Sequence, residues 1–278
     1  MTEAPVRSQA ALPLTQDFNQ EQLEEQGMRL IEDAIQLSRF QQFEWAIPRA
    51  KLATQLVPNR FEGWYILGTL LVQEGELEEG IRVLKRAEIL EPNESGIYSI
   101  LGAAYFQSGQ YELAVPELET ALALGDESIE VLFDLGNAQL KLGEYAAAIA
   151  TYERSLELQD DFWPAINNIG LIYYEQGKID AAIDQWEQAI EIDPSMAEPQ
   201  LAVAVATYVN KGNQAEGLEL AREALELDGR YGEIDFLDEN LWGASLLQAT
   251  EVVFATPSLQ AVFEELTDRA FQPEEMTP

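Results

Sequence analysis

The chain has 278 residues, of which 50 are Asp or Glu and 16 are Lys or Arg, so its formal net charge is −34 at pH 7. It contains neither cysteine nor histidine, which excludes disulfides and removes the usual metal ligands and the usual neutral-pH acid/base. So large a negative charge would repel phosphate groups, and we expect no nucleic-acid partner. The acidic surface either serves solubility or attracts a basic partner.

The first segment, residues 1–16, shows no usable periodicity and contains two prolines among small and polar residues. We expect it to be disordered. The stretch from Glu21 to Phe40 then has the apolar spacing of one long helix. Directly after it lies a group of large apolar residues that we expect to form an end-cap core, namely Phe40, Phe43, Trp45 and Ile47.

Glycines recur at a step of 34 residues through the middle of the chain. One set is suited to tight turns between antiparallel helices, because glycine adopts a left-handed backbone at little energetic cost and other residues do not. This set is Gly75, Gly109, Gly143 and Gly177. The other set is suited to close contact between two helices: Gly68, Gly102, Gly136 and Gly170. Such a period predicts stacked helix pairs that bury their apolar faces against one another.

Aromatic, Leu-Gly and Tyr positions accompany these glycines, as in Tyr98, Leu101, Gly102 and Tyr105. In these positions the chain resembles the tetratricopeptide repeat (TPR) family. The resemblance implies an all-α, right-handed solenoid spanning residues 17–231. It divides into about six helix pairs, at residues 27–60, 61–94, 95–128, 129–162, 163–196 and 197–231.

After the repeats the pattern changes, and residues 232–271 are predicted to form helices. We interpret them as a cap over the last repeat, and the alternative is a docking surface on which Trp242 and Phe254 are exposed to a partner. In the final helix, Leu259, Val262, Phe263 and Leu266 lie on one face. The tail, residues 272–278, is acidic and contains proline.

In the TPR family, function usually lies on the concave wall lined by the first helices. Carried over position by position, the resemblance implies a largely apolar groove for a protein segment, formed by Tyr65, Thr69, Phe106, Phe133, Asn137, Leu140, Asn167, Leu171 and Tyr174. Chaperone-binding members hold a terminal carboxylate with lysines and asparagines. That clamp is missing here, because Tyr65, Ser99 and Phe133 occupy the lysine positions.

Two groups of groove residues each allow two interpretations. Asn137, Asn167 and Asn168 could hydrogen-bond the backbone of a bound segment, or be ordinary surface polarity. Phe106, Phe133 and Tyr174 could anchor an apolar partner side chain, or pack between repeats.

We therefore predict a cytoplasmic, non-enzymatic scaffold or adaptor that binds an apolar or basic protein segment. No catalytic, cofactor-binding or metal-binding residues are predicted. The alternatives are an assembly or stability factor for a multi-subunit complex, such as a photosynthetic or respiratory membrane complex, and a self-associating structural protein. No apolar run is long enough for a membrane span, which leaves peripheral membrane association open.

Overall fold

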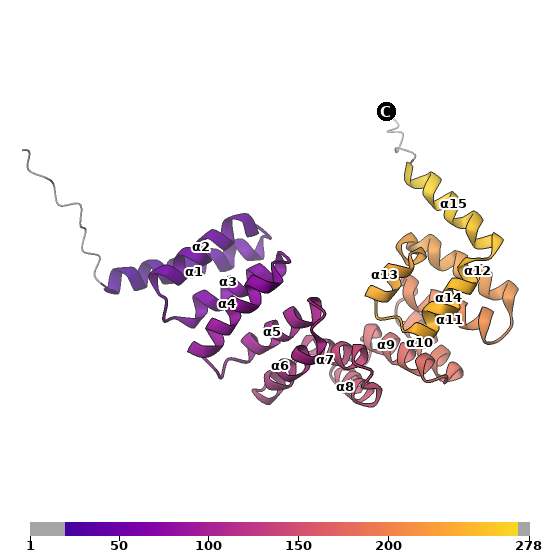
Figure 1. The fold of residues 1–278 in the computed structure, drawn as a ribbon, viewed down its shortest axis with the longest axis horizontal. Coiled ribbons are helices and arrows are strands. Elements are labelled where there is room, and N and C mark those ends of the chain that lie inside the picture. Colours follow the sequence, from indigo (N-terminus) through magenta and orange to yellow (C-terminus); the bar gives the residue numbers. More distant parts are fainter. Residues whose placement is uncertain (1–19, 272–278) are drawn as a thin grey trace, which may run out of the picture. The chain divides into compact units, whose positions relative to one another are not determined.

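The computed structural model describes residues 20–271, and every regular element in this range is a helix (Figure 1). The all-α class predicted from the sequence is confirmed. None of these helices is long and apolar enough to cross a membrane. The predicted disordered segment 1–16 and the acidic tail 272–278 lie outside the described residues.

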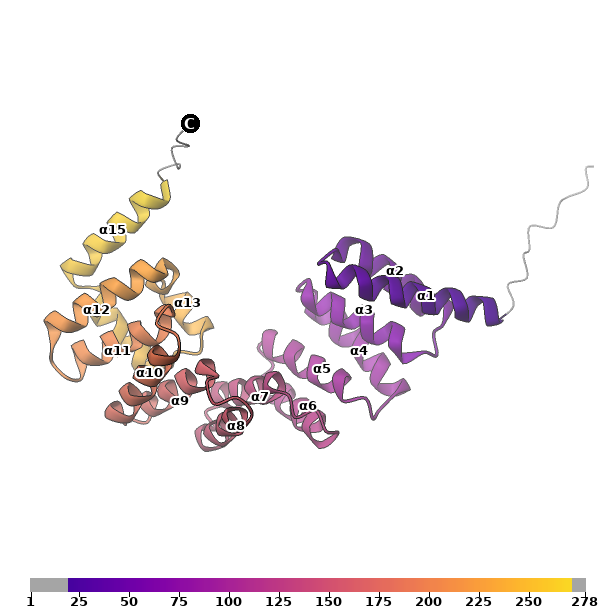
Figure 2. The same cartoon turned by 180° about the vertical axis from the view of Figure 1, so that it is seen from behind.

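Two compact units divide the chain, with the boundary inside α5 between Ile97 and Tyr98. The first unit contains α1 (Gln20–Arg39), α2 (Phe43–Leu56), α3 (Phe61–Gln73), α4 (Leu77–Leu90) and the start of α5 (Ser95–Gln107). The second contains the rest of α5, α6 (Tyr111–Ala123), α7 (Ile129–Lys141), α8 (Tyr145–Leu158), α9 (Trp163–Glu175), α10 (Ile179–Ile192), α11 (Ala197–Val209), α12 (Gln214–Leu227), the 3₁₀ turn η1 (Gly229–Gly232), α13 (Ile234–Glu239), α14 (Ala244–Phe254) and α15 (Pro257–Phe271). In the second unit, seen from both sides in Figures 1 and 2, α7 to α12 follow one another as helix hairpins.

The turn glycines have the predicted left-handed backbone, with φ of 81° at Gly75, 73° at Gly109, 74° at Gly143 and 71° at Gly177. Each lies one or two residues after the end of a helix, where its N–H continues the hydrogen bonding of the last turn. The equivalent position between α1 and α2 is Gln41, which adopts φ of 56° without being glycine.

The second glycine set lies where two helices approach closely, as predicted. A Cβ added at Gly102 would lie 2.4 Å from a side-chain carbon of Leu118, and one at Gly170 would lie 2.5 Å from Nε1 of Trp186. The missing side chains therefore make room for large residues of the following helix to pack on the backbone.

Leu118 allows a direct test of this packing, because α6 also carries an exposed leucine. Leu118 is fully buried beneath Gly102, whereas Leu113 is 47% exposed. We expect Leu118→Ala to lower the free energy of unfolding by about 2–5 kcal/mol and Leu113→Ala to change it by no more than about 0.5 kcal/mol. Urea denaturation of the two variants measures both values, and equal losses would contradict the assignment of α6's buried face.

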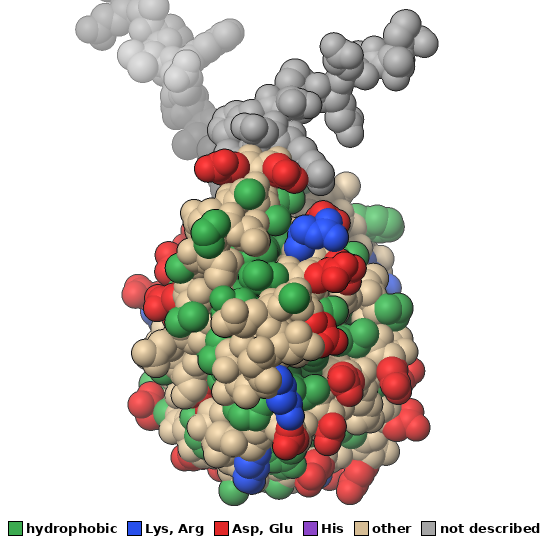
Figure 3. All heavy atoms as spheres, turned by 90° about the vertical axis from the view of Figure 1, so that its right-hand side faces the viewer, with side chains coloured by type: hydrophobic (Ala, Val, Ile, Leu, Met, Phe, Trp, Pro, Cys, Tyr) green, Lys and Arg blue, Asp and Glu red, His purple; other side chains and the backbone are tan. Residues whose placement is uncertain are grey.

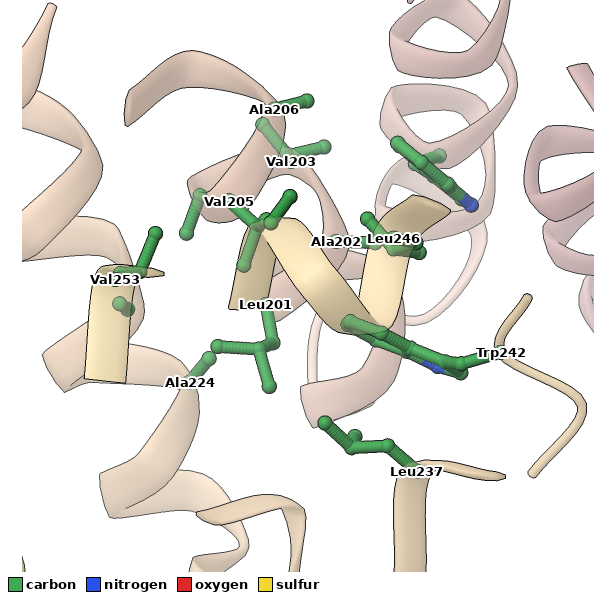
Figure 4. Close-up of a cluster of buried hydrophobic side chains, with 14 of the residues drawn as sticks. Leu201, Ala202, Val203, Val205, Ala206, Ala224, Leu237, Trp242, Leu246 and Val253 are labelled. Carbon is green, nitrogen blue, oxygen red and sulfur yellow. The ribbon is translucent and has the colours of Figure 1, made fainter. Parts of the chain in front are cut away.

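The C-terminal segment folds back against α9 and α11 of the same unit. Figure 4 shows Leu237, Trp242, Leu246 and Val253 converging on the buried side chains of α11. Trp242 is 2% exposed and Phe254 7% exposed, so the alternative in which these two rings face a partner is wrong. They are core residues because α11 is apolar over more than one face and needs covering on its second side.

The following helix, α15, begins at Pro257 and packs its predicted apolar face on this core, with Leu259 buried and Val262, Phe263 and Leu266 half-buried. At the start of α14, the carboxylate of Glu175 accepts hydrogen bonds from the backbone N–H groups of Ser245 (3.2 Å) and Leu246 (3.0 Å). A carboxylate at a helix N-terminus satisfies free N–H groups and interacts favourably with the helix dipole. The contact joins α14 to α9.

At the N-terminal end, the predicted end-cap core is only partly present. Phe43 and Ile47 pack against the buried residues of α1 and α3, but Phe40 is 73% and Trp45 56% exposed. The expectation is therefore wrong for Phe40 and Trp45. Phe40 lies in the turn after α1, and Trp45 is on the solvent side of α2, since its neighbour Ala46 takes the buried position.

Acidic side chains are spread over the face of the molecule drawn in Figure 3. On the face drawn in Figure 3, Asp and Glu side chains are scattered among apolar and polar ones, with isolated Lys and Arg between them. This distribution suits either solubility or a long-range attraction for basic molecules.

Candidate functional site

Four of the predicted groove residues converge on one pocket of about 290 Å³ in the second unit, namely Phe106, Phe133, Asn137 and Asn167. Its walls come from α5, α7, α9 and α11 on one side and from η1, α13 and the turn after α13 on the other. The remaining lining residues are Trp163, Pro164, Asn168, Glu198, Tyr231, Glu239, Asn240 and Leu241.

The other predicted groove residues lie elsewhere. Leu140 is 8% and Leu171 1% exposed, which corrects the expectation that their side chains line a groove: both face the neighbouring helix. Tyr174 is also buried, and its ring centroid lies 5.9 Å from that of Trp186 with the two planes tilted by 36°. Its hydroxyl donates a hydrogen bond to Asn210, and the residue borders a separate depression of about 410 Å³. Tyr65 and Thr69 are half-buried residues of α3 in the first unit.

The floor of the pocket is a buried network of amides built on Tyr152. Its hydroxyl donates to Oδ1 of Asn137 (2.7 Å) and accepts from Nδ2 of Asn168 (3.2 Å), and Nδ2 of Asn168 also donates to Asn137 Oδ1 (3.0 Å). Asn167 Nδ2 continues the chain by donating to Asn168 Oδ1 (3.2 Å). All four residues are buried, so the interpretation of the asparagines as ordinary surface polarity is wrong.

One acceptor in this network is unused. Asn167 is 1% exposed, and its Oδ1 has no hydrogen-bond partner among the described residues. Its orientation follows from the network, because Nδ2 must face the oxygen of Asn168. A buried acceptor without a donor is costly, and this one belongs to a residue that lines the pocket.

Glu198 is the second unusual group of the pocket. It is a carboxyl of α11 only 7% exposed, and it accepts a hydrogen bond from Nε1 of Trp242 (3.1 Å). Burial raises its pKa to about 7, and hydrogen bonds with Asn167, Trp242 and Tyr231 oppose that rise. The carboxyl is therefore poised to change its charge near neutral pH.

The outer wall of the pocket belongs to the C-terminal segment. Leu241 adopts φ of 70° and packs on the same buried cluster as Phe133 and Phe162, whose rings meet edge to face with their centroids 5.2 Å apart. Lys141 of α7 donates to the backbone oxygen of Asp238 (2.9 Å) and lies 3.3 Å from its carboxylate. These contacts hold α13 and its turn over α7 and complete the pocket.

Comparison with protein families matches two segments of the chain, residues 94–161 to a tetratricopeptide repeat model and residues 170–212 to a TPR repeat model. Both matched segments carry the helix hairpins and turn glycines described above. Residues 94–161 and 170–212 of the chain are tetratricopeptide repeats.

Solved TPR structures resemble the chain over part of its length. A crystal structure of MamA protein is 26% identical with a TM-score of 0.56, over 61% of this chain and 93% of that one. YrrB, described as a TPR protein with an unusual peptide-binding site, is 22% identical with a TM-score of 0.56, over 63% of this chain and 90% of that one. MamA from Desulfovibrio magneticus RS-1 is 19% identical with a TM-score of 0.58, over 62% and 97%. No curated protein matches the chain.

Four residues of the pocket were not among the site residues predicted from the sequence: Glu198, Trp163, Tyr231 and Leu241. In the sequence, Glu198 resembles any acidic residue in the first turn of a helix. The only sign that it would be buried was the exceptionally apolar character of the rest of α11. Tyr231 ends the last repeat and Leu241 follows it, so no repeat position predicts that they line a pocket with residues of α7 and α9.

Removing the central hydroxyl tests the amide network. Tyr152→Phe would leave buried polar atoms of Asn137 and Asn168 without that partner, and we expect the free energy of unfolding to fall by about 1–3 kcal/mol. Tyr145→Phe is the control, because Tyr145 is half-buried in the same helix and its hydroxyl has no partner among the described residues. Thermal and urea unfolding should separate the two variants, and a neutral Tyr152→Phe would contradict the network.

Proposed function

We propose that this protein is a non-enzymatic interaction scaffold and that the pocket in its second unit binds a segment of a partner protein. The observation that carries the proposal is the combination of half-buried aromatic walls with a buried amide whose oxygen lacks a donor. Aromatic side chains of this kind supply most of the binding energy in many interfaces. An amide acceptor suits the N–H groups that a peptide segment presents.

The surroundings of the pocket support a protein segment as the ligand. It is lined by residues from α5, α7, α9, α11, η1, α13 and the turn after α13, so an extended segment lying along α7, α9 and α11 would contact several of them at once. YrrB, which shares the fold, is a TPR protein with an unusual peptide-binding site.

A displayed library of random peptides tests the proposal on the full chain. We expect the selection to enrich a set of peptides. Calorimetry should then show that each of them binds with a stoichiometry of one peptide per chain. Phe106→Ala should weaken binding at least about tenfold, because Phe106 forms part of the aromatic wall. The matched control is Phe40→Ala, which removes a ring that is 73% exposed in the other unit. Failure to enrich any peptide, or equal binding by Phe106→Ala and the parent chain, would overturn the proposed site.

A further inference from the structure

The pocket contains negative charge without a positive partner. Glu198 and Glu239 line it, and the lining set includes neither lysine nor arginine. Glu198 is buried, yet the groups that hydrogen-bond it, Asn167, Trp242 and Tyr231, are all neutral. A buried carboxylate is strongly stabilised by a cation and costly without one.

Two cations on the elements that form the pocket, Arg230 of η1 and Lys141 of α7, are already engaged by carboxylates. Arg230, next to Tyr231, forms a two-pronged contact with Asp228, with its Nε 3.0 Å from Oδ1 and its Nη2 2.6 Å from Oδ2, and its guanidinium lies over the ring of Phe236. Lys141 is held by Asp238. Neither side chain lines the pocket.

Acceptors and aromatic surfaces occur together beside this charge. Asn167, which hydrogen-bonds Glu198, carries the unpartnered Oδ1 and can accept one more N–H. Phe106, Phe133 and Trp163 supply ring surfaces in the same pocket. A guanidinium offers several N–H donors in one plane and stacks favourably on aromatic rings, whereas an ammonium is a compact, strongly hydrated charge.

We propose that the pocket takes an arginine side chain of the bound segment, and a lysine less well, with the cation paired to Glu198 and one N–H donated to Asn167 Oδ1. This inference rests on the proposed function, since it names the chemistry of the ligand at the same site. The volume of about 290 Å³ leaves room for a long side chain. The formal net charge of −34 would draw a basic segment towards the chain before it binds.

The test uses peptides selected from the random library against the full chain. We expect them to share an arginine at one position. Replacing that arginine by citrulline, which keeps the shape and loses the charge, should weaken binding to the parent chain at least about tenfold. Against Glu198→Gln the same replacement should cost less than about threefold, because the charge partner has gone.

Asp235→Asn is the matched control, since Asp235 is an exposed carboxylate of α13 that does not line the pocket. It should leave the citrulline effect within about twofold of its value in the parent chain. Two outcomes would overturn the inference and leave the proposed function standing. In the first, the selected peptides compete for the pocket but share no basic residue. In the second, the citrulline replacement weakens binding equally in the parent chain and in Glu198→Gln. A library that yields no binder overturns both the inference and the proposed function. If Glu198→Gln does not fold, the inference is tested by the parent chain alone, as the difference in affinity between the arginine peptide and its citrulline form.

Discussion

Replacing Trp186 by alanine is expected to lower the free energy of unfolding by about 3–5 kcal/mol, as for other fully buried large aromatic side chains. Trp186 of α10 is completely buried, and its ring lies directly on the backbone of Gly170 in α9. Its Nε1 donates to the backbone oxygen of Asn167 at 3.2 Å. Alanine would leave a cavity between the two helices and remove this additional hydrogen bond to the Asn167 carbonyl.

Trp45→Ala provides the comparison, because Trp45 is 56% exposed in α2. That variant should change the free energy of unfolding by no more than about 1 kcal/mol. Urea denaturation followed by circular dichroism measures both. A loss for Trp186→Ala as small as that for Trp45→Ala would show that Trp186 does not hold α9 and α10 together.

Ionisation of Glu198 is expected to make the protein less stable as the pH rises towards 8. Its pKa is raised by burial from the ordinary 4.5 to about 7 in the folded chain, so the folded state holds the proton more tightly than the unfolded state does. The destabilisation is absent below about pH 4.5, grows between about pH 4.5 and 7, and is complete above pH 7. At about 1.4 kcal/mol per unit of pKa it amounts to about 3 kcal/mol.

Glu198→Gln should remove this effect while keeping an acceptor for Trp242. We expect the variant to gain about 2–3 kcal/mol relative to the parent chain between pH 5 and pH 8. Asp134 has its pKa raised to about 6 by burial and by the nearby charge of Glu130, so it destabilises both proteins in the same pH direction. Urea denaturation at several pH values measures the free energy of unfolding of the parent chain and of Glu198→Gln, and the difference between the two reports on Glu198 alone. A difference that does not change with pH would mean that the Glu198 carboxyl is solvated.

The repeat hairpins could be predicted from sequence because their determinants are local. A turn that needs positive φ favours glycine at Gly143 and Gly177, and a large residue on the next helix requires a missing side chain at Gly136 and Gly170. Each of these constraints acts within one repeat and returns 34 residues later. A single chain therefore displays them several times.

The pocket could be predicted only in part, because half of it depends on contacts between distant residues. Phe133 and Asn137 follow from repeat position. Glu198 becomes a buried carboxyl only when Trp242, 44 residues further along, lies against it. Leu140 and Leu171 were misplaced because helical spacing does not distinguish an inner wall from the face just beneath it.

The five tryptophans provide the most direct measurement of where a segment binds, because each gives one indole N–H signal in a ¹⁵N-labelled protein. Trp163 lines the pocket and Trp242 hydrogen-bonds its carboxyl, whereas Trp45 and Trp64 lie in the first unit. On titration with a selected peptide, we predict shifts of the Trp163 and Trp242 signals while those of Trp45 and Trp64 stay in place. Shifts confined to Trp45 and Trp64 would place binding in the other unit and contradict the account.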